Sequence, residues 1–492
     1  MSRIQVADLT FAYDSSFDYI FEHVSFQIDT DWKLGFIGRN GRGKTTFLNL
    51  LLGKYEYSGT ISASVDFEYF PYPVENPDDL TLNIVESVNP HAETWQIFKE
   101  LNLMDTDPEL LYRPFSTLSN GERTKVLLAA LFLKENAFLL IDEPTNHLDV
   151  NAREKVARYL NSKKGFILVS HDRTFLDKCI DHVLSINKTN IEIQKGTFSS
   201  WFANKEAMDQ MEMERNAQLK TDIRRLEEAA KRTERWSDKV ESTKIGQRVA
   251  GLRPDRGHIG HQAAKMMKRS KSTQKRQQNA IAEKETLLKN IETMDELKLN
   301  PLTYHTDLIL SMEDVGISYG KTPVFEKLSF SVRRGSRVCL RGKNGCGKTS
   351  LIKLILGEKI PYTGSFHLGS GIRISYISQD TSWLKGSLTK FAREYELDET
   401  IFKALLRKLD FDRVQFEKKI EEYSEGQKKK VLIAKSLCEP AHLFIWDEPL
   451  NFVDVFSRMQ IEDLLLKYQP TMLFVEHDEA FQEKIATQIV NL

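Results

Sequence analysis

The 492-residue sequence has few cysteines and no long apolar run. Its four cysteines, Cys179, Cys339, Cys346 and Cys438, form no C-x-x-C pair and no group with zinc-ligand spacing, which argues against a disulfide framework and a structural zinc site. No stretch approaches the roughly 18–20 consecutive apolar residues that cross a bilayer, and the first residues contain no apolar signal core. We therefore expect a cytosolic protein with reduced thiols that forms no membrane pore by itself.

Net charge is also nearly absent, because 69 Lys and Arg balance 70 Asp and Glu. One segment departs from this balance. Residues 242–282 contain ten Lys or Arg and one acid, a net charge of +9 in 41 residues. Such a segment indicates contact with a polyanion, although a solvated helical face is the alternative interpretation.

The rest of the composition is that of a globular protein. Hydrophobic residues make up 41% and charged residues 28%, which excludes a fully disordered or fibrous chain. The length is enough for two or three domains of ~100–200 residues each.

The sequence contains its own duplicate. Four short motifs recur at offsets between 304 and 306 residues. They are G-R-N-G-R-G-K-T at 38–45 and G-K-N-G-C-G-K-T at 342–349, L-S-N-G-E at 118–122 and Y-S-E-G-Q at 423–427, L-L-I-D-E-P at 139–144 and F-I-W-D-E-P at 444–449, and S-H-D at 170–172 and E-H-D at 476–478. We expect two homologous domains, 1–200 and 304–492, joined by an unduplicated linker, 201–303.

Each copy has the pattern of an α/β domain. Continuous apolar runs predict buried parallel strands at 36–37, 138–141 and 166–169, and at 338–340, 443–445 and 472–475. The Gly-rich motifs come between a strand and an apolar helix, predicted over 47–52 in the first copy and 351–356 in the second.

The linker has a different pattern. Glycine and proline gather at its centre, between 246 and 260, and polar stretches with apolar residues at helical spacing flank them. Leu219, Ile223 and Leu226 recur in this way on one side, and Ile281, Leu288, Ile291 and Met294 on the other. These patterns predict two antiparallel helices of ~35 residues, reaching roughly 50 Å, that are joined by a basic loop.

The motif G-x-x-x-x-G-K-T between a strand and a helix predicts a phosphate cradle. Its glycines let backbone N–H groups converge on the β- and γ-phosphates, and the helix N-terminus adds positive potential. Lys44 and Lys348 then carry charge to the phosphates, and Thr45 and Thr349 supply a ligand to Mg²⁺. Two matches in register make an accidental Gly-rich turn an unconvincing alternative.

Carboxylate pairs end strands beside both cradles. Asp142 and Asp447 can hold the Mg²⁺ shell. Glu143 and Glu448 follow directly, and a carboxylate near the γ-phosphate can orient or deprotonate the attacking water. The alternative interpretation is an Asp-Glu pair that only caps a loop.

Together these motifs resemble the nucleotide-binding domains of ATP-binding cassette (ABC) proteins, over about four fifths of the chain. The resemblance implies an intramolecular sandwich in one monomer, with ATP between Lys44 and the pair Ser424 and Gly426, and between Lys348 and the pair Ser119 and Gly121. It also implies switch histidines at 171 and 477, adenine-stacking aromatics at 13 and 319, and ATP and Mg²⁺ as cofactors. The residues expected at the two sites are Glu143, Glu448, His171 and His477 for catalysis; Tyr13, Gly38, Asn40, Gly41, Gly43, Lys44, Thr45, Thr46, Ser119, Gly121, Tyr319, Gly342, Asn344, Gly345, Gly347, Lys348, Thr349, Ser350, Ser424 and Gly426 for nucleotide; and Thr45, Asp142, Thr349, Gln379 and Asp447 for Mg²⁺.

The two copies depart from each other. Aligning F-E-Y-F-P-Y at 67–72 with I-S-Y-I-S-Q at 374–379 puts Tyr72 where the family has its Mg²⁺-binding glutamine, Gln379 in the second copy. His147 in the first copy is matched by Phe452 in the second. Because both copies keep the glutamate, we expect both to hydrolyse ATP at different rates.

A tandem arrangement with a linker of about 100 residues resembles the ABC-F subfamily, whose members act on ribosomes. The spacing of 75 residues from Lys44 to Ser119, and of 76 from Lys348 to Ser424, leaves no room for the arm that housekeeping members often carry. The chain also ends directly after the second copy. These features resemble the antibiotic-resistance members of the Lsa/Vga type; a housekeeping translation factor and the ATPase of a membrane transporter are the alternatives.

The resemblance implies the 70S ribosome as partner. Contacts would include 23S rRNA near the peptidyl-transferase centre and the exit-site tRNA, with no membrane-spanning partner. Drugs acting at that centre, the lincosamides, pleuromutilins and streptogramin A compounds, would be countered. The residues expected to contact the ribosome form the linker tip, Lys244, Arg248, Arg253, Arg256 and His258.

Overall fold

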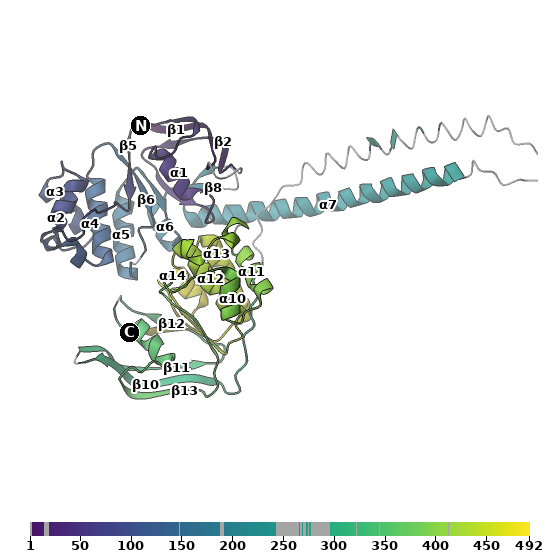
Figure 1. Cartoon of the computed structure of the whole chain (residues 1–492). Coiled ribbons are helices and arrows are strands. Elements are labelled where there is room, and N and C mark those ends of the chain that lie inside the picture. The colour runs from purple at the N-terminus through teal and green to yellow at the C-terminus, as the bar shows by residue number, and fades with distance from the viewer. Residues whose placement is uncertain are drawn as a thin grey trace, which may run out of the picture. The chain divides into compact units, whose positions relative to one another are not determined.

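The computed structural model describes most of the chain. The described residues are 2–13, 19–146, 148–186, 191–242, 296–320, 322–343, 345–411 and 413–492, with six single positions between 265 and 276. The structure divides into two compact units, Met1–Trp201 with Met294–Leu492, and Phe202–Thr293. In Figure 1 the first copy runs from purple to blue and the second from green to yellow.

The first copy has two sheets, as apolar runs between polar turns dictate. Strands β1 (Arg3–Phe11), β2 (Phe21–Asp29) and β4 (Ser58–Ser62) pair antiparallel in the order β2-β1-β4. The second sheet has the order β5-β6-β7-β3-β8-β9, parallel except for β8 with β9. Its strands are β3 (Lys33–Ile37), β5 (Asp66–Phe70), β6 (Ala137–Asp142), β7 (Phe166–Val169), β8 (His182–Ile186) and β9 (Ile191–Lys195).

The second copy repeats this plan. Strands β10 (Leu308–Tyr319), β11 (Thr322–Arg333) and β13 (Tyr362–Leu368) form an antiparallel sheet of order β11-β10-β13. A parallel sheet has the order β14-β15-β16-β12-β17. Its strands are β12 (Arg337–Arg341), β14 (Ile374–Ile377), β15 (Leu443–Asp447), β16 (Met472–Val475) and β17 (Gln488–Asn491).

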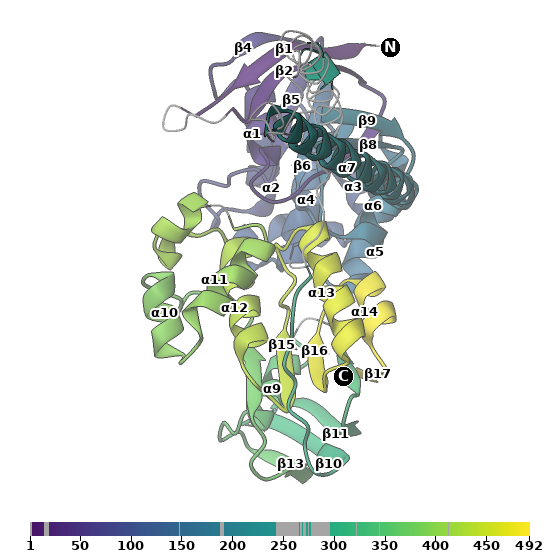
Figure 2. The ribbon, with the colours of Figure 1, turned by 90° about the vertical axis from the view of Figure 1, so that its right-hand side faces the viewer.

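Helices cover the parallel sheets. In the first copy they are α1 (Lys44–Leu51), α2 (Thr81–Val88), α3 (Thr94–Leu103), η1 (Pro108–Tyr112), η2 (Phe115–Thr117), α4 (Asn120–Phe132), α5 (Val150–Ser162) and α6 (Arg173–Cys179). In the second they are α9 (Lys348–Ile355), α10 (Leu388–Glu394), α11 (Glu399–Lys408), η3 (Arg413–Glu417), η4 (Ile420–Glu422), α12 (Glu425–Cys438), α13 (Val455–Tyr468) and α14 (Glu479–Ile485). Figure 2 shows α12 and α13 beside β15 and β16.

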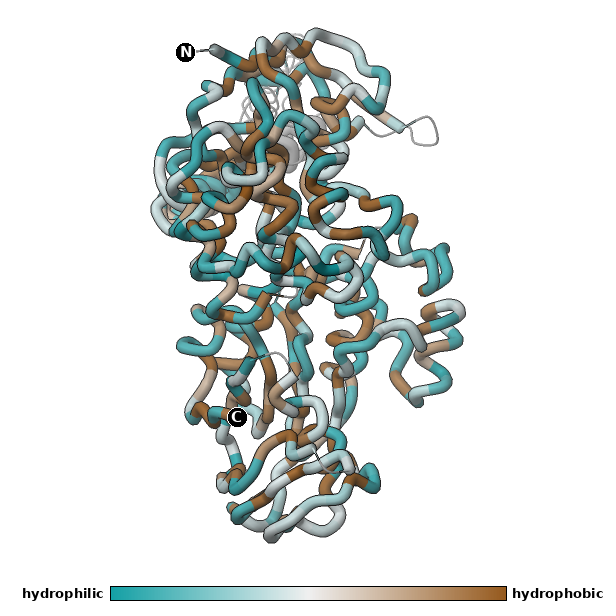
Figure 3. Tube along the Cα trace, turned by 90° about the vertical axis from the view of Figure 1, so that its left-hand side faces the viewer, coloured by the Kyte–Doolittle hydropathy of each residue, from teal (hydrophilic) through white to brown (hydrophobic). Residues whose placement is uncertain are grey.

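The predicted strands and the two helices after the Gly-rich motifs are confirmed by β3, β6, β7, β12, β15, β16, α1 and α9. All four residues of β7 and all four of β16 are buried, as expected of strands covered on both faces. Phe47 of α1 packs edge-on against Phe21 and Phe36, and it anchors the first cradle helix to the core. Figure 3 shows brown, apolar segments inside each copy and teal, polar ones along the outer loops.

The first linker helix is confirmed, and it is longer than predicted. Helix α7 (Phe198–Ser242) has 45 residues and contains neither glycine nor proline. Pairs of opposite charge one turn apart support it, such as Lys205 with Asp209 and Arg224 with Glu228. None of the helices in the described part of the chain combines the length and apolarity of a membrane span.

The other half of the linker is mostly outside the described residues. Six positions there, 265, 268, 272, 273, 275 and 276, are helical. The antiparallel hairpin and the domain boundaries at 200 and 304 stay predictions. The linker tip residues Lys244, Arg248, Arg253, Arg256 and His258 lie outside the described residues, as do Asn344 and His147.

Candidate active site

Both Gly-rich motifs close into loops that end at a helix. Gly43 and Gly347 stand just before α1 and α9 with φ of 89° and 101°, values that favour glycine. A Cβ on Gly43 would lie 2.5 Å from Ile20, and one on Gly347 would lie 2.4 Å from Val324. Glycine at these two positions is therefore required by both backbone conformation and space.

The two cradle lysines turn back onto their own loops. Lys44 Nζ donates to the carbonyls of Gly38 at 2.6 Å and Arg39 at 3.2 Å. Lys348 Nζ donates to Gly342 at 2.9 Å and Lys343 at 3.0 Å. Burial lowers the pKa of Lys44. Each loop thus presents one nearly buried ammonium and a helix N-terminus, a set that fits phosphate oxygens.

A hydroxyl and a carboxylate flank each lysine. Thr349 Oγ1 donates to Asp447 Oδ2 at 3.4 Å, and burial together with the charge of Glu448 raises the pKa of Asp447 to about 6. Burial also raises the pKa of Asp142, against hydrogen bonds from Tyr69 and Thr45. No cluster of three or more His, Cys, Asp or Glu that could hold a metal occurs among the described residues. One carboxylate and one hydroxyl at each cradle are oxygen ligands that would suit Mg²⁺ bound together with a nucleotide.

The serines at 119 and 424 begin helices. Ser119 caps α4, where its hydroxyl accepts from Glu122 N and its own N–H and hydroxyl donate to Glu122. Ser424 caps α12 in the same way with Gln427. Burial opposes ionisation of Glu122, but the bonds from Ser119 outweigh it and lower the pKa of that carboxyl.

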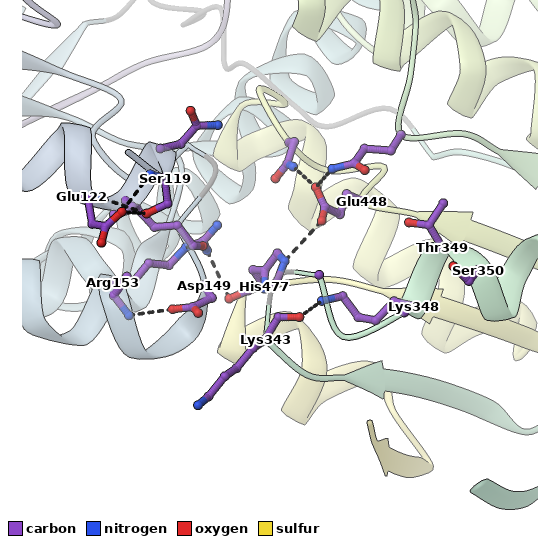
Figure 4. Close-up of a pocket in the computed structure, with 18 of the residues that line it drawn as sticks. Ser119, Glu122, Asp149, Arg153, Lys343, Lys348, Thr349, Ser350, Glu448 and His477 are labelled. Carbon is purple, nitrogen blue, oxygen red and sulfur yellow. Dashed lines mark hydrogen bonds and ion pairs between the residues drawn. The ribbon is translucent and has the colours of Figure 1, made fainter. Parts of the chain in front are cut away.

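One cavity joins the two copies at the second cradle. Its volume is about 890 Å³. Figure 4 shows Ser119 and Glu122 on one side, and Lys348, Thr349, Glu448 and His477 on the other. The lining includes these sequence-predicted residues: Ser119, Gly121, Tyr319, Gly345, Gly347, Lys348, Thr349, Ser350, Gln379, Glu448 and His477. The structure therefore places Lys348 in the same cavity as Ser119 and Gly121, as the ABC resemblance implied.

At the first cradle the copies touch directly. Asn40 Nδ2 donates to the carbonyl of Phe452 at 3.2 Å, and Arg39 forms an ion pair with Asp410. A Cβ on Gly426 would lie 2.3 Å from the carbonyl of Phe452, so only glycine fits between the signature helix and this segment. Asn40 and Gly426 thus lie at a tight contact between the copies, whereas Lys348 lines a cavity.

The two strand-end glutamates have different surroundings. Glu448 Oε2 accepts from Gln379 Nε2 and Asn451 Nδ2, both at 2.7 Å, and His477 Nε2 lies 3.2 Å from Oε1. Burial opposes its ionisation, but His477 and the other donors outweigh burial and lower its pKa. Glu143 Oε1 lies 3.3 Å from His171 Nε2 but accepts no hydrogen bond from the described residues.

The pKa of Glu143 is therefore raised, whereas that of Glu448 is lowered. Burial, then the charge of Asp142, raise the pKa of Glu143 to about 8. Burial and the nearby ammonium of Lys44 also hold the pKa of His171 well below its usual range, so this imidazole is neutral. Both glutamates have positive φ, 50° at Glu143 and 48° at Glu448, a strained backbone typical of functional sites.

Strand register confirms the alignment of Tyr72 with Gln379. Phe70 pairs with Ile141 in the first copy, and Ile377 pairs with Trp446 in the second. Phe70 lies two residues before Tyr72, and Ile377 lies two residues before Gln379. In the first copy Tyr69 Oη donates to Asp142 Oδ2 at 2.9 Å. Tyr69 and Asn451 lie beside the strand-end carboxylates but were not among the residues expected at the sites, although Tyr69 belongs to the aligned segment 67–72.

The two tyrosines expected near adenine lie at the helix starts. Tyr13 Oη lies 2.8 Å from Thr46 Oγ1, and Tyr319 Oη donates to Ser350 Oγ at 3.1 Å. They are 38% and 52% exposed, which leaves ring surface for a planar ligand. Their stacking on adenine stays a prediction.

The opposite pKa shifts predict different pH profiles for the two sites. With Glu448→Gln, turnover relies on Glu143 and should rise between about pH 7 and pH 9, because this carboxyl must ionise to act as base. With Glu143→Gln, turnover relies on Glu448 and should show no such rise, because its pKa is already low. Phosphate release at saturating Mg-ATP measures both. Coinciding profiles and equal residual rates would contradict the inequality of the sites.

Comparison with known proteins agrees with this geometry. A family model described as ABC transporter matches residues 21–146 and 325–451, just over half of the chain. The ribosome protection protein VmlR of Bacillus subtilis (strain 168) is 28% identical over 498 residues, covering 96% of this chain and 84% of that protein. The ATP-binding protein Uup of Buchnera aphidicola subsp. Acyrthosiphon pisum is 25% identical, covering 99% and 80%.

Solved structures share the fold. The archaeal ribosome recycling factor aABCE1, solved in complex with the archaeal ribosomal stalk protein aP1, superposes with a TM-score of 0.60 at 17% identity, covering 98% of this chain and 87% of that chain. An RNase-L inhibitor structure gives 0.59 at 17% identity, with the same coverage. The chain therefore belongs to the ABC family, as a tandem ATPase of the ABC-F type.

Proposed function

We propose that this ATPase binds the ribosome and protects it from antibiotics that act at the peptidyl-transferase centre. The observation that carries the proposal is the similarity to VmlR, which is named for ribosome protection and aligns over 96% of this chain and 84% of its own length. The basic segment 242–282 supports it, because Lys and Arg that neutralise phosphates supply affinity for rRNA. Lincosamides, pleuromutilins and streptogramin A compounds are the drug classes proposed.

We assign the nucleotide chemistry to the two composite sites. Lys44 and Lys348 would bind β- and γ-phosphates. Thr45 with Asp142, and Thr349 with Asp447 and Gln379, would hold Mg²⁺, which neutralises charge on the phosphates. Glu143 and Glu448 would orient and deprotonate the attacking water. The buried Oε1 of Glu143, which accepts no hydrogen bond from the described residues, supports this role in the first site.

Two other functions compete. A housekeeping ABC-F translation factor would bind ribosomes without giving drug resistance. The 75- and 76-residue spacings without an inserted arm favour the resistance type. An ATPase of a membrane transporter would need transmembrane segments from a partner chain.

A drug-susceptibility panel tests the proposal. A susceptible strain that expresses the chain should tolerate several-fold more lincosamide, pleuromutilin or streptogramin A than the same strain with empty vector. Unchanged susceptibility to all three classes, together with ribosome binding, would favour the housekeeping alternative.

A sedimentation experiment tests whether the ribosome is the partner. With ATP present and hydrolysis blocked, the protein should cosediment with 70S ribosomes, and less so as salt rises, because bound cations displace counterions from phosphates. Recovery with membranes and not with ribosomes would contradict the proposal and restore the transporter interpretation.

A further inference from the structure

We propose that Arg153 of the first copy positions the switch histidine of the second site, and so couples that site to the first. The inference rests on the proposed function of the two sites. Arg153 lies in α5 and also lines the cavity at Lys348. Its Nη1 donates to the backbone carbonyl of His477 at 3.1 Å, across the boundary between the two copies.

The same guanidinium holds the switch segment of its own copy. Arg153 Nη1 also donates to Asp172 Oδ2 at 2.9 Å, and the two side chains are 12% and 7% exposed. Asp172 follows His171 directly and caps α6 by accepting from Phe175 N at 2.9 Å. One nearly buried cation thus joins the backbone of His477 to the residue beside His171.

Arg458 is the equivalent arginine of the second copy. It repeats the hydrogen bonds of Arg153 within its own copy, but not the bond to the switch histidine of the other copy. Arg458 Nε donates to the carbonyl of Val453 at 2.9 Å, as Arg153 Nε does to Leu148 at 3.1 Å. Arg458 Nη1 donates to Asp478 at 3.1 Å. Arg458 Nη2 donates to Leu450 O of its own copy at 2.9 Å, and the charge of Arg458 also acts on Glu143 and His171 of the first copy, although no hydrogen bond joins them. Among the described residues, only Arg153 of this pair donates to the opposite switch histidine.

The side chain of His477 connects its backbone, which Arg153 contacts, to the carboxylate of Glu448. His477 Nε2 lies 3.2 Å from Glu448 Oε1. A charge-assisted bond to the carbonyl of His477 fixes the backbone that orients this imidazole. Movement of the segment 171–172 with the state of the Lys44 site therefore displaces Arg153, and with it the orientation of His477 toward Glu448.

Single-site backgrounds test this role. In Glu143→Gln protein, which turns over only at Glu448, Arg153→Met and Arg153→Lys should each lower kcat about tenfold with KM changed less than about twofold. Lysine keeps a cation for Asp172 but lacks the planar fork that serves two acceptors. In Glu448→Gln protein, Arg153→Lys should change kcat less than about twofold. Arg158→Met, an exposed arginine of the same helix, is the matched control and should change neither.

The outcomes separate this inference from the site assignment. Loss of rate in both backgrounds alike, or in neither, overturns the positioning role of Arg153, while the glutamate assignments stand. If the glutamate variants do not confine turnover to one site, both proposals fall. Melting temperatures of all variants check folding, and Arg153→Lys, which retains the charge beside Asp172, keeps the test valid if Arg153→Met is unstable.

Discussion

Replacing both strand-end glutamates, Glu143→Gln with Glu448→Gln, should reduce ATP hydrolysis at least about 100-fold and leave ATP binding intact. General-base catalysis contributes roughly 10²–10⁴-fold, and glutamine has the same shape without the basic oxygen. The amide can still accept from Gln379 and Asn451, which now hold Glu448. Phosphate release and the binding of a fluorescent ATP analogue measure the two quantities.

A matched control separates chemistry from general effects of lost charge. Glu22 on β2 and Glu326 on β11 are exposed glutamates of the same two copies, so Glu22→Gln with Glu326→Gln should leave hydrolysis at the parent rate. The catalytic double variant should also accumulate on ribosomes, because bound ATP persists. Parental hydrolysis by that variant would refute the assignment of both glutamates.

Shortening the linker tip should abolish antibiotic protection while hydrolysis changes less than about twofold. Replacing residues 248–258 by a Gly-Ser turn removes three arginines and the apolar Val249 and Leu252. In the loop that the sequence predicts here, apolar side chains favour contact with a partner. Arginine can stack on bases and bridge phosphates. Inhibitory drug concentrations in cells at matched expression, and phosphate release by purified protein, form the paired measurement.

A second variant asks what the tip contributes. Changing Arg248, Arg253 and Arg256 to lysine keeps the charge but removes the planar guanidinium groups, and we expect protection to fall partway toward the empty vector. Full protection by the shortened protein would overturn the linker-tip mechanism. Lost hydrolysis in the shortened protein would instead show that the tip contributes to folding.

The sequence by itself determined the repeated architecture. Strands such as β6 and β7 are continuous apolar runs, and the Gly-rich motifs between strand and helix leave few other local structures. The position of Tyr72 opposite Gln379 also followed from alignment alone, since the two copies carry the same strands in the same register. These are properties of neighbouring residues, which a linear pattern records.

Only the tertiary structure decided how the surroundings of the two strand-end glutamates differ. Glu143 and Glu448 occur in the same tripeptide, D-E-P, yet burial raises the pKa of the first to about 8 while surrounding donors lower that of the second. The contact of Arg153 with the carbonyl of His477 joins residues 324 positions apart. Desolvation and hydrogen bonding depend on which distant side chains surround a group, and no spacing within a motif encodes that.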